Sequence, residues 1–270
     1  ENAVRMINSN LDMNITKYVC VDWKALVDVI DALGGLDLDL TKEEVHWVNG
    51  YITETANSIG YPCDALKGEG RVHLNGVQAV SYSRIRYTSG DDFLRASRQR
   101  IVLQAILEKC KGEDIATLTS MCSSMMDDIS TNFTVKEILA LAKNVTKYQI
   151  SSTTGFPYNV ATKELSGVGD TVIPIDLATD VVQLHKYLFE DESYTVSNTV
   201  QTISDAVQKK TGVDSKTEIY DTTKYNNTAG ATGTEGAKQK NKDAQDALKK
   251  SQSESENDTT TKSSSDDSDD

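Results

Sequence analysis

Apolar residues recur every three or four positions through most of the chain, which is the pattern of amphipathic helices. This spacing predicts helices over residues 23–33, 74–82, 93–109, 115–126, 134–145, 177–189 and 197–209, with further helix-like sequence at the N-terminus. Thr41 and Glu44 have the spacing of a capping box, as do Thr134 and Glu137. A short helix is therefore also expected after Thr41.

Other segments have the patterns of strands and loops. Short apolar or alternating runs predict strands over 18–21, 36–40, 148–154 and 170–175. Residues 50–72 are polar and rich in glycine, which predicts a long loop. Because strands and helices alternate, the fold class is α/β or α+β. We expect α/β/α layers, with a mixed central sheet covered by helices.

Composition divides the chain into three parts. It has 270 residues, of which 38% are hydrophobic, and a formal net charge of -13. From residue 214 onward aliphatic runs almost disappear, and Ser, Thr, Asp and Glu accumulate towards the end. Such sequence buries too little apolar surface to offset the entropy of ordering the chain. We predict a main domain over 1–190, a short helical extension over 191–213 and a disordered acidic tail over 214–270.

The four cysteines do not have the spacing of a metal site. The chain has no CxxC and no histidine at ligand spacing, which argues against zinc. Cys20 lies in the apolar run 18–21, where we expect a small buried side chain. Cys110 and Cys122 either stay free or form a disulfide, the latter if the protein lies outside the cytoplasm.

Common catalytic and targeting motifs are absent from the sequence. It contains no GxxxxGK[ST], GxGxxG, GxSxG or HExxH. No segment is apolar enough to span a bilayer, and no signal peptide is recognisable. Because the chain opens on Glu1 and runs directly into helix-like sequence, we expect it to be a fragment that has lost its beginning.

Arginines are concentrated in one short region of this acidic chain. Five of the seven lie within seventeen residues, namely Arg84, Arg86, Arg95, Arg98 and Arg100. Guanidinium groups repel one another unless anions or carboxylates lie among them, and their forked geometry matches phosphate oxygens. Two interpretations follow: a phosphate or pyrophosphate site, or a basic surface stripe paired with acidic residues elsewhere.

Local geometry favours the first interpretation. If residues 84–86 are extended, Arg84 and Arg86 point to one side and Ile85 to the other. After a turn, Asp91 or Asp92 is placed to cap the following helix. The positive end of that helix, with its free N–H groups, also favours an anion.

The following helix directs part of the cluster inward. Arg95 and Gln99 share a helical face with Val102 and Ile106, so they are expected on the inner side of its first turns. Arg98 diverges from that face, as Arg100 does, and is expected on the surface or behind the residues that contact the anion.

The order of these motifs resembles the signature of the LytR-CpsA-Psr family of cell-wall proteins. The chain reads LNGVQA over 74–79, YSRIRY over 82–87 and DFLRASRQ over 92–99. It is similar there to the family pattern LNGxqAL, then RxR, then DxxRxxRQ. The segments YVCVD over 18–22 and DALGGL over 31–36 resemble a further family segment. The likeness is close to about residue 110 and continues to about 190.

The resemblance implies a fold, a reaction and a set of site residues. Such proteins move a phosphate-linked glycopolymer from a polyprenyl pyrophosphate lipid to peptidoglycan, at the extracytoplasmic face of the cell membrane. It implies Arg84, Arg86 and Arg95 as catalytic residues, and it places Gln99, Asp92 and Arg98 with them at the pyrophosphate, Asp92 orienting the arginines. An apolar tunnel for the lipid is also implied, for which Leu26, Ile30, Val102 and Ile106 are candidates, although residues of this kind more often belong to a plain core.

The chain departs from the family pattern at its beginning. Family members start with a cytoplasmic segment, a transmembrane helix and a half-domain that carries acidic residues implicated in Mg²⁺ binding and another arginine. We therefore expect Mg²⁺ as the cofactor with its ligands outside this chain, and we assign no metal ligand or general base within it. We also expect an absent single-pass anchor, an open sheet edge or exposed apolar face, and no catalysis by the fragment alone.

Two other functions compete with the transferase. A non-catalytic protein could bind polyprenyl phosphate or an anionic wall polymer through the same arginines. A transcription regulator would need a basic element that reads a DNA groove, and this acidic chain has no such stripe, so no nucleic-acid partner is expected. The identity of the glycopolymer, whether teichoic acid, capsule or another, stays open.

Overall fold

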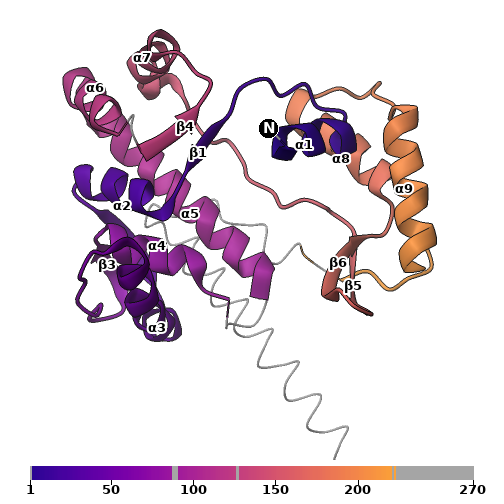
Figure 1. Ribbon diagram of the computed structural model, residues 1–270, viewed down its shortest axis with the longest axis horizontal. Helices are drawn as coiled ribbons and strands as arrows, with labels where there is room; N and C mark the ends of the chain where they lie inside the picture. The colour runs from indigo at the N-terminus through magenta and orange to yellow at the C-terminus, as the bar shows by residue number, and fades with distance from the viewer. Residues whose placement is uncertain (1, 87–90, 126–127, 221, 223–270) are drawn as a thin grey trace, which may run out of the picture.

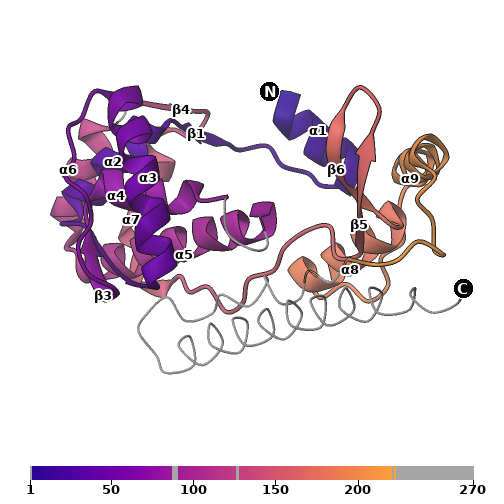
Figure 2. The same cartoon turned by 90° about the horizontal axis from the view of Figure 1, so that it is seen from below.

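The computed structural model describes residues 2–86, 91–125, 128–220 and 222. Its elements fall into two groups, which are visible in Figure 1 and, from below, in Figure 2. The larger group consists of β1 (Val19–Val21), α2 (Trp23–Ala32), β2 (Leu36–Leu40), α3 (Lys42–Ile59), β3 (Gly70–Leu74), α4 (Gly76–Arg84), α5 (Asp91–Gly112), α6 (Ile115–Ser124), β4 (Ile129–Thr131), α7 (Val135–Lys143) and the 3₁₀ turn η2 (Val145–Lys147). The smaller group consists of α1 (Asn2–Leu11), β5 (Val160–Leu165), β6 (Gly169–Pro174), α8 (Leu177–Phe189) and α9 (Asn198–Thr211).

The mixed α/β class is confirmed, but the strands are arranged differently from the prediction. Over the described part of the chain they form three separate antiparallel pairs, β1 with β4, β2 with β3 and β5 with β6, in place of one mixed central sheet. Strand β2 has the alternation expected of it, since Leu36, Leu38 and Leu40 are buried and the two aspartates between them are partly exposed. Strand pairing is non-local, so alternation in one strand does not identify its neighbour.

The main hydrophobic core lies where α2, α3, α4 and α5 pack on the β2–β3 pair. Val27 and Ile30 of α2, Val48 of α3, Val80 of α4 and Val102 of α5 are at most 2% exposed. Each comes from an apolar stripe at helical spacing. This core fixes the relative positions of α2, α3, the end of α4 and the start of α5, which carry the site described below.

Helix α3 corrects the predicted long loop over 50–72. The capping box of Thr41 and Glu44 is present, but the helix that it opens runs for 18 residues to Ile59. Gly60 is its C-cap, in the left-handed conformation with φ 77°. Strand β3 then begins at Gly70. The buried positions Val48, Ile52 and Thr55 continue the helical spacing through this polar sequence.

Two of the expected strands also differ from the structure. Residues 148–154 contain no strand, and the first strand of that region, β5, begins at Val160. Strand β1 forms as predicted but is exposed, with Val19 at 56% and Val21 at 45%, and Cys20 is exposed rather than buried. The apolar side chains of β1 therefore lie on the surface of the described part of the chain, which agrees with the expected exposed apolar face.

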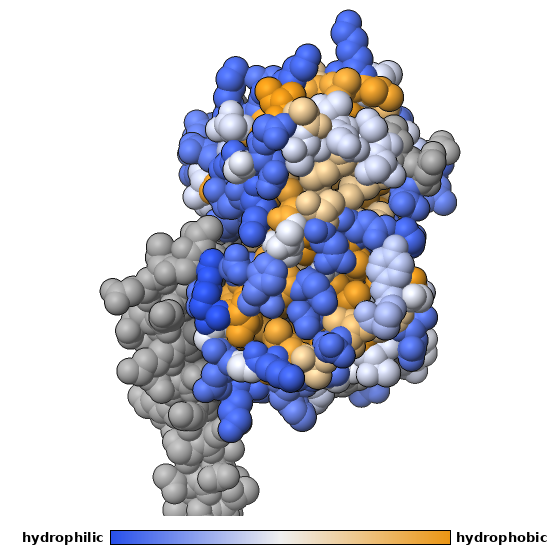
Figure 3. Space-filling view, turned by 90° about the vertical axis from the view of Figure 1, so that its left-hand side faces the viewer, coloured by the Kyte–Doolittle hydropathy of each residue, from blue (hydrophilic) through white to orange (hydrophobic). Residues whose placement is uncertain are grey.

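Other apolar side chains also reach the surface. Figure 3 shows them gathered in patches between polar residues, including one towards α6 and α7. Ile115 of α6 and Val135 and Leu141 of α7 are each 46–57% exposed.

Cys110 and Cys122 are free thiols, and burial raises the pKa of both. No described helix is both long and apolar enough to cross a membrane.

The predicted extension contains α9, which packs against α8 and α1. Val200 of α9 is fully buried beside Val181 of α8. The division at residue 190 stays a prediction. Of the predicted tail, the structure describes 214–220 and 222, with Tyr220 bridged to Val160 of β5; the rest lies outside the described residues.

Close contact between α2 and α4 requires a glycine at position 76. A Cβ atom there would lie 2.4 Å from the carbonyl oxygen and 2.8 Å from the Cα of Val27, and backbone atoms cannot rotate away. We expect Gly76→Ala to lower the free energy of unfolding by about 1–3 kcal/mol. Gly50→Ala is the control, because Gly50 also lies within a helix with nothing within 4 Å of the added atom. It should gain about 0.5–1 kcal/mol. Urea unfolding measures both, and equal effects would contradict the steric argument.

Asp180 of α8 is a fully buried carboxylate in the smaller group. It accepts weak hydrogen bonds from the backbone and side-chain nitrogens of Asn159, at 3.4 and 3.2 Å. Burial raises the pKa of Asp180 from 3.8 to about 6. The folded chain therefore holds this proton where the unfolded chain has released it, so the stability linked to Asp180 falls as pH rises from about 4 to about 6.

Asp180→Asn isolates this linkage, because asparagine keeps the shape and does not titrate. Between pH 4 and pH 7, the unchanged protein should therefore lose about 1–3 kcal/mol of unfolding free energy relative to the variant. Chemical denaturation across this range measures the difference. A difference that does not depend on pH would show that Asp180 titrates normally.

Candidate anion-binding site

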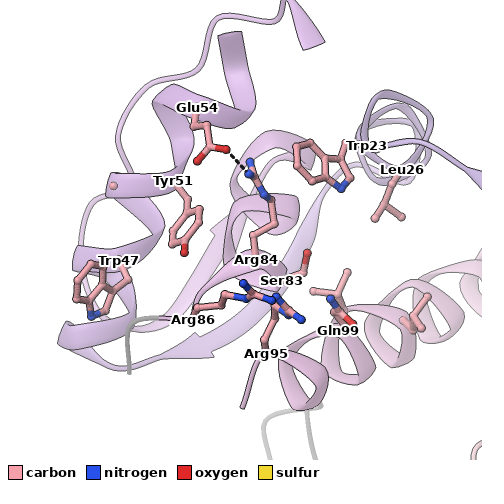
Figure 4. Close-up of a pocket in the computed structure, with 13 residues that line it drawn as sticks. Trp23, Leu26, Trp47, Tyr51, Glu54, Ser83, Arg84, Arg86, Arg95 and Gln99 are labelled. Carbon is pink, nitrogen blue, oxygen red and sulfur yellow. Dashed lines mark hydrogen bonds and ion pairs between the residues drawn. The ribbon is translucent and has the colours of Figure 1, made fainter. Parts of the chain in front are cut away.

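A pocket of about 780 Å³ lies between α2, α3, the end of α4 and the first turns of α5. Figure 4 shows three arginines pointing into it, Arg84 from the end of α4, Arg86 from the segment that follows and Arg95 from α5, opposite aromatic side chains of α2 and α3. Its lining consists of Trp23, Leu26, Trp47, Gly50, Tyr51, Glu54, Ser83, Arg84, Arg86, Arg95, Gln99, Val102 and Leu103. Among these described residues, three guanidinium groups face one carboxylate, that of Glu54, so the pocket is cationic within an acidic chain.

Arg84 enters the pocket as the last residue of α4. The helix starts with Asn75 as its N-cap, in a capping box with Gln78, and Ile85 is its C-cap. Arg84 was expected in an extended segment, whereas the extended residue is Ile85, with φ -56° and ψ 125°. Ile85 is fully buried, and Arg84 and Arg86 on either side of it both line the pocket. The prediction that Arg84 and Arg86 point to one side and Ile85 to the other is therefore confirmed. The end of helix α4 is its structural cause.

Arg86 and Arg95 meet at the carboxylate of Asp92. Asp92 Oδ1 lies 2.9 Å from Arg86 Nε and 3.0 Å from Arg95 Nη2. This buried oxygen has no hydrogen bond of good geometry among the described residues. Helix α5 begins at Asp91, next to residues that lie outside the described part of the chain, so the capping role expected of Asp91 or Asp92 stays a prediction. Asp92 thus holds Arg86 and Arg95 together, but its single negative charge does not balance their two positive charges.

The inner face of α5 continues the pocket wall. Arg95, Gln99 and Val102 follow one another along this face and all line the pocket, as their spacing predicts. Val102 is 2% exposed, and Ile106, one turn further, packs against the main core. Among the candidates for an apolar tunnel, Leu26 and Val102 reach the pocket, while Ile30 and Ile106 belong to the core.

Arg98 lies elsewhere, in the core behind the pocket. It is 4% exposed and is not among the lining residues, so of the two expected positions the one behind the anion-contacting residues is correct and the surface position is wrong. Its Nε lies 3.1 Å from Glu44 Oε1, and its Nη1 donates to the carbonyl oxygen of Ile85 at 3.3 Å. Tyr82 lies beside this pair, and burial raises the pKa of its hydroxyl well above the usual range. Arg98 therefore ties α3, α5 and the segment between Arg84 and Arg86 together.

Trp23, Tyr51 and Glu54 complete the site and were not predicted. Arg84 Cζ lies 3.8 Å from the ring centroid of Trp23, and Arg84 Nη2 donates to Glu54 Oε1 at 2.6 Å. Tyr51 and Glu54 fall in the segment interpreted as a loop. The signal that would have placed them is the helical spacing of Val48 and Ile52, which continues past Gly50.

The described residues do not form a divalent-cation site. They contain no group of three or more His, Cys, Asp or Glu side chains that could hold a metal ion. Mg²⁺ prefers several oxygen ligands. Among the described residues, Glu54 is the one carboxylate that lines the pocket, and it is paired with Arg84. The described lining therefore does not fit the expected cofactor by itself.

Known proteins have sequences similar to part of this chain. TagV of Bacillus subtilis strain 168, named a polyisoprenyl-teichoic acid–peptidoglycan teichoic acid transferase, is 27% identical over 143 residues, covering 52% of this chain and 34% of TagV. TagU of Bacillus mycoides strain KBAB4, which has the same functional name, is 30% identical over 146 residues, covering 53% of this chain and 42% of TagU. The chain thus spans less than half the length of these curated relatives.

A solved crystal structure has a fold similar to that of this chain. The crystal structure of protein gbs0355 from Streptococcus agalactiae superposes with a TM-score of 0.53 at 26% identity, over 72% of this chain and 63% of that one. The LytR_cpsA_psr family model matches residues 1–182, which include the whole pocket. The chain therefore belongs to the LytR-CpsA-Psr family.

Proposed function

We propose that this protein transfers a phosphate-linked glycopolymer from a polyprenyl-pyrophosphate carrier to peptidoglycan, at the outer face of the cell membrane. The observation that carries the proposal is the convergence of Arg84, Arg86 and Arg95 in one pocket with apolar and aromatic walls. The names of the TagU and TagV relatives support this reaction class. Guanidinium forks suit the diphosphate, and the apolar wall formed by Leu26, Val102 and other residues suits a lipid.

The reaction suits a site that supplies charge and position. A sugar hydroxyl of peptidoglycan attacks the phosphorus that carries the glycopolymer, and the bond to the bridging oxygen of the diphosphate breaks. The products are a phosphodiester between polymer and peptidoglycan, a released polyprenyl phosphate and the proton of the hydroxyl. Negative charge spreads over the phosphoryl oxygens in the transition state. The three arginines, already gathered at the end of α4 and the start of α5, stabilise that charge.

Supply of purified lipid-linked glycopolymer and peptidoglycan to the full-length protein in which this chain occurs tests this proposal, and the same assay on the chain alone tests the expectation that the fragment is inactive. Covalent polymer on the peptidoglycan and an equal amount of free polyprenyl phosphate are the expected products. One observation favours the alternative of a non-catalytic binder: the only lining carboxylate is already engaged by an arginine, so no free base faces the pocket among the described residues. Saturable binding of the lipid-linked polymer with no release of polyprenyl phosphate would support the binder and contradict the transferase.

A further inference from the structure

Arg84 has an environment unlike that of the other two pocket arginines. Its guanidinium contacts an aromatic face, a buried hydroxyl and a carboxylate, contributed by Trp23, Thr55 and Glu54. Arg86 and Arg95 instead share one carboxylate. We propose that Trp23 and Thr55 are positioning residues that fix Arg84 as the anion anchor of the pocket, and that Glu54 is its resident counterion, which the diphosphate displaces. This inference rests on the proposed function.

Trp23 holds the plane of the guanidinium. Arg84 Cζ lies 3.8 Å from the Trp23 ring centroid, a stacking distance, and 5.5 Å from that of Tyr51 on the other wall. Planar guanidinium groups stack on aromatic faces and keep their N–H donors free in the plane. Trp23 is the first residue of α2, whose start is fixed by the N-cap Asp22. The ring is therefore anchored by the backbone of a packed helix.

Thr55 holds the edge of the guanidinium. It is fully buried on α3, and its Oγ1 accepts from Arg84 Nη1 at 2.7 Å. The same oxygen lies 3.1 Å from the hydroxyl of Ser81 on α4, which donates to it. A buried hydroxyl with two donors has little freedom to move. With its face and one nitrogen held, Arg84 has a defined position that does not depend on Glu54.

Glu54 differs from Thr55 in its freedom to leave. Its side chain is 66% exposed, whereas that of Arg84 is 14% exposed. An exposed carboxylate regains its hydration when it rotates away, and an exposed ion pair contributes little to stability. Arg84 cannot follow because Trp23 and Thr55 hold it. A bound diphosphate therefore takes over the Nη2 donor, and removal of the Glu54 charge should strengthen anion binding.

Calorimetric titration of the chain with inorganic pyrophosphate tests the two roles. We expect Trp23→Leu and Thr55→Val to bind pyrophosphate about three- to tenfold more weakly, with thermal stability unchanged or nearly so. Trp23→Phe keeps an aromatic face and should recover most of the affinity. Phe133→Leu is the matched control, because Phe133 forms a remote cation–π contact with Lys17, at 5.2 Å. It should bind like the unchanged chain.

Glu54→Gln separates a counterion from a positioning residue. Glutamine keeps an oxygen that accepts from Arg84 but removes the negative charge. We expect pyrophosphate to bind about three- to tenfold more tightly, because one like charge has left the pocket. If Glu54 instead orients Arg84, the variant will bind more weakly, and that outcome overturns the counterion role.

Fluorescence gives a readout that does not depend on ligand binding. The chain contains two tryptophans, so in a Trp47→Phe background selective excitation of tryptophan reports on Trp23 alone. Addition of Arg84→Ala should shift and intensify its emission if the guanidinium covers the ring. Identical spectra with and without Arg84 would show that the stack is absent, and would overturn the proposal even if Trp23→Leu failed to fold.

The outcomes separate this inference from the proposed function. If the chain binds pyrophosphate and Arg84→Ala abolishes binding, but Trp23→Leu and Thr55→Val bind normally, the positioning roles are wrong and the anion site stands. If the unchanged chain does not bind pyrophosphate, the anion site fails and this inference fails with it. Weaker binding by Trp23→Leu that simply follows a loss of folded protein would assign Trp23 a structural role and also contradict the proposal.

Discussion

Replacement of Arg95 with alanine is expected to lower glycopolymer transfer by about 10²–10³-fold, the effect of removing one preorganised donor from an active site. Arg95 projects from the second turn of α5 into the pocket, with its Nη2 3.0 Å from Asp92 Oδ1. Its loss leaves Asp92 paired with Arg86 alone and removes a positive charge where the phosphoryl group becomes more negative. The rate of polyprenyl phosphate release at saturating lipid-linked polymer measures the effect.

Two further variants test whether the effect depends on the guanidinium group and on its place in the pocket. Arg95→Lys keeps the charge but not the fork, so it should recover only part of the lost rate. Arg71→Ala removes an arginine from β3 that pairs with Asp39, outside the pocket, and should leave the rate unchanged. A fully active Arg95→Ala protein would contradict the catalytic role, and retention of weak lipid binding by an inactive one would agree with it.

Replacement of Arg98 with methionine is expected to destabilise the fold by about 3–5 kcal/mol, the cost of leaving one member of a buried ion pair without its partner. The side chains of Arg98 and Glu44 are 5% and 13% exposed. The substitution also removes the donor to the carbonyl of Ile85. Urea unfolding of the chain, followed by circular dichroism, measures the change.

A double variant tests whether the penalty comes from the uncompensated charge. Arg98→Met combined with Glu44→Gln removes both charges, and glutamine still accepts at the capping box with Thr41. We expect this protein to recover most of the lost stability. Arg71→Met breaks an exposed pair with Asp39 and should cost no more than about 1 kcal/mol. If Arg98→Met costs no more than Arg71→Met, the buried pair is not important to the fold.

The capping patterns of the helices were predictable because their signals are local. Thr41 with Glu44 and Thr134 with Glu137 form the predicted capping boxes, and Asn75 caps the helix that precedes the arginines. Each contact links residues three apart, so the sequence alone brings its partners together. The inner face of α5 was predictable for the same reason, since the helical period places Arg95 and Gln99 above Val102.

The length of α3 was missed because composition obscured its period. Gly50 and the polar residues around it are typical of a loop, but Val48, Ile52 and Thr55 pack against α4 and hold the segment helical. Tertiary contacts of this kind override weak local preferences. Tyr51 and Glu54 line the site from this helix, so they could not be predicted as site residues once the segment was interpreted as a loop.

Sequence by itself determined which residues are close through the backbone: the helix starts, the inward face of α5 and the arginine motifs that resemble the family. Only the tertiary structure decided what each arginine meets. Arg98 and Glu44 are separated by 54 positions, and Arg84 and Glu54 by 30. The same guanidinium either binds a carboxylate in the core or faces an open pocket, depending on which helices pack beside it. Charge and spacing do not contain that information, because burial and partner choice are fixed by contacts between segments distant in the chain.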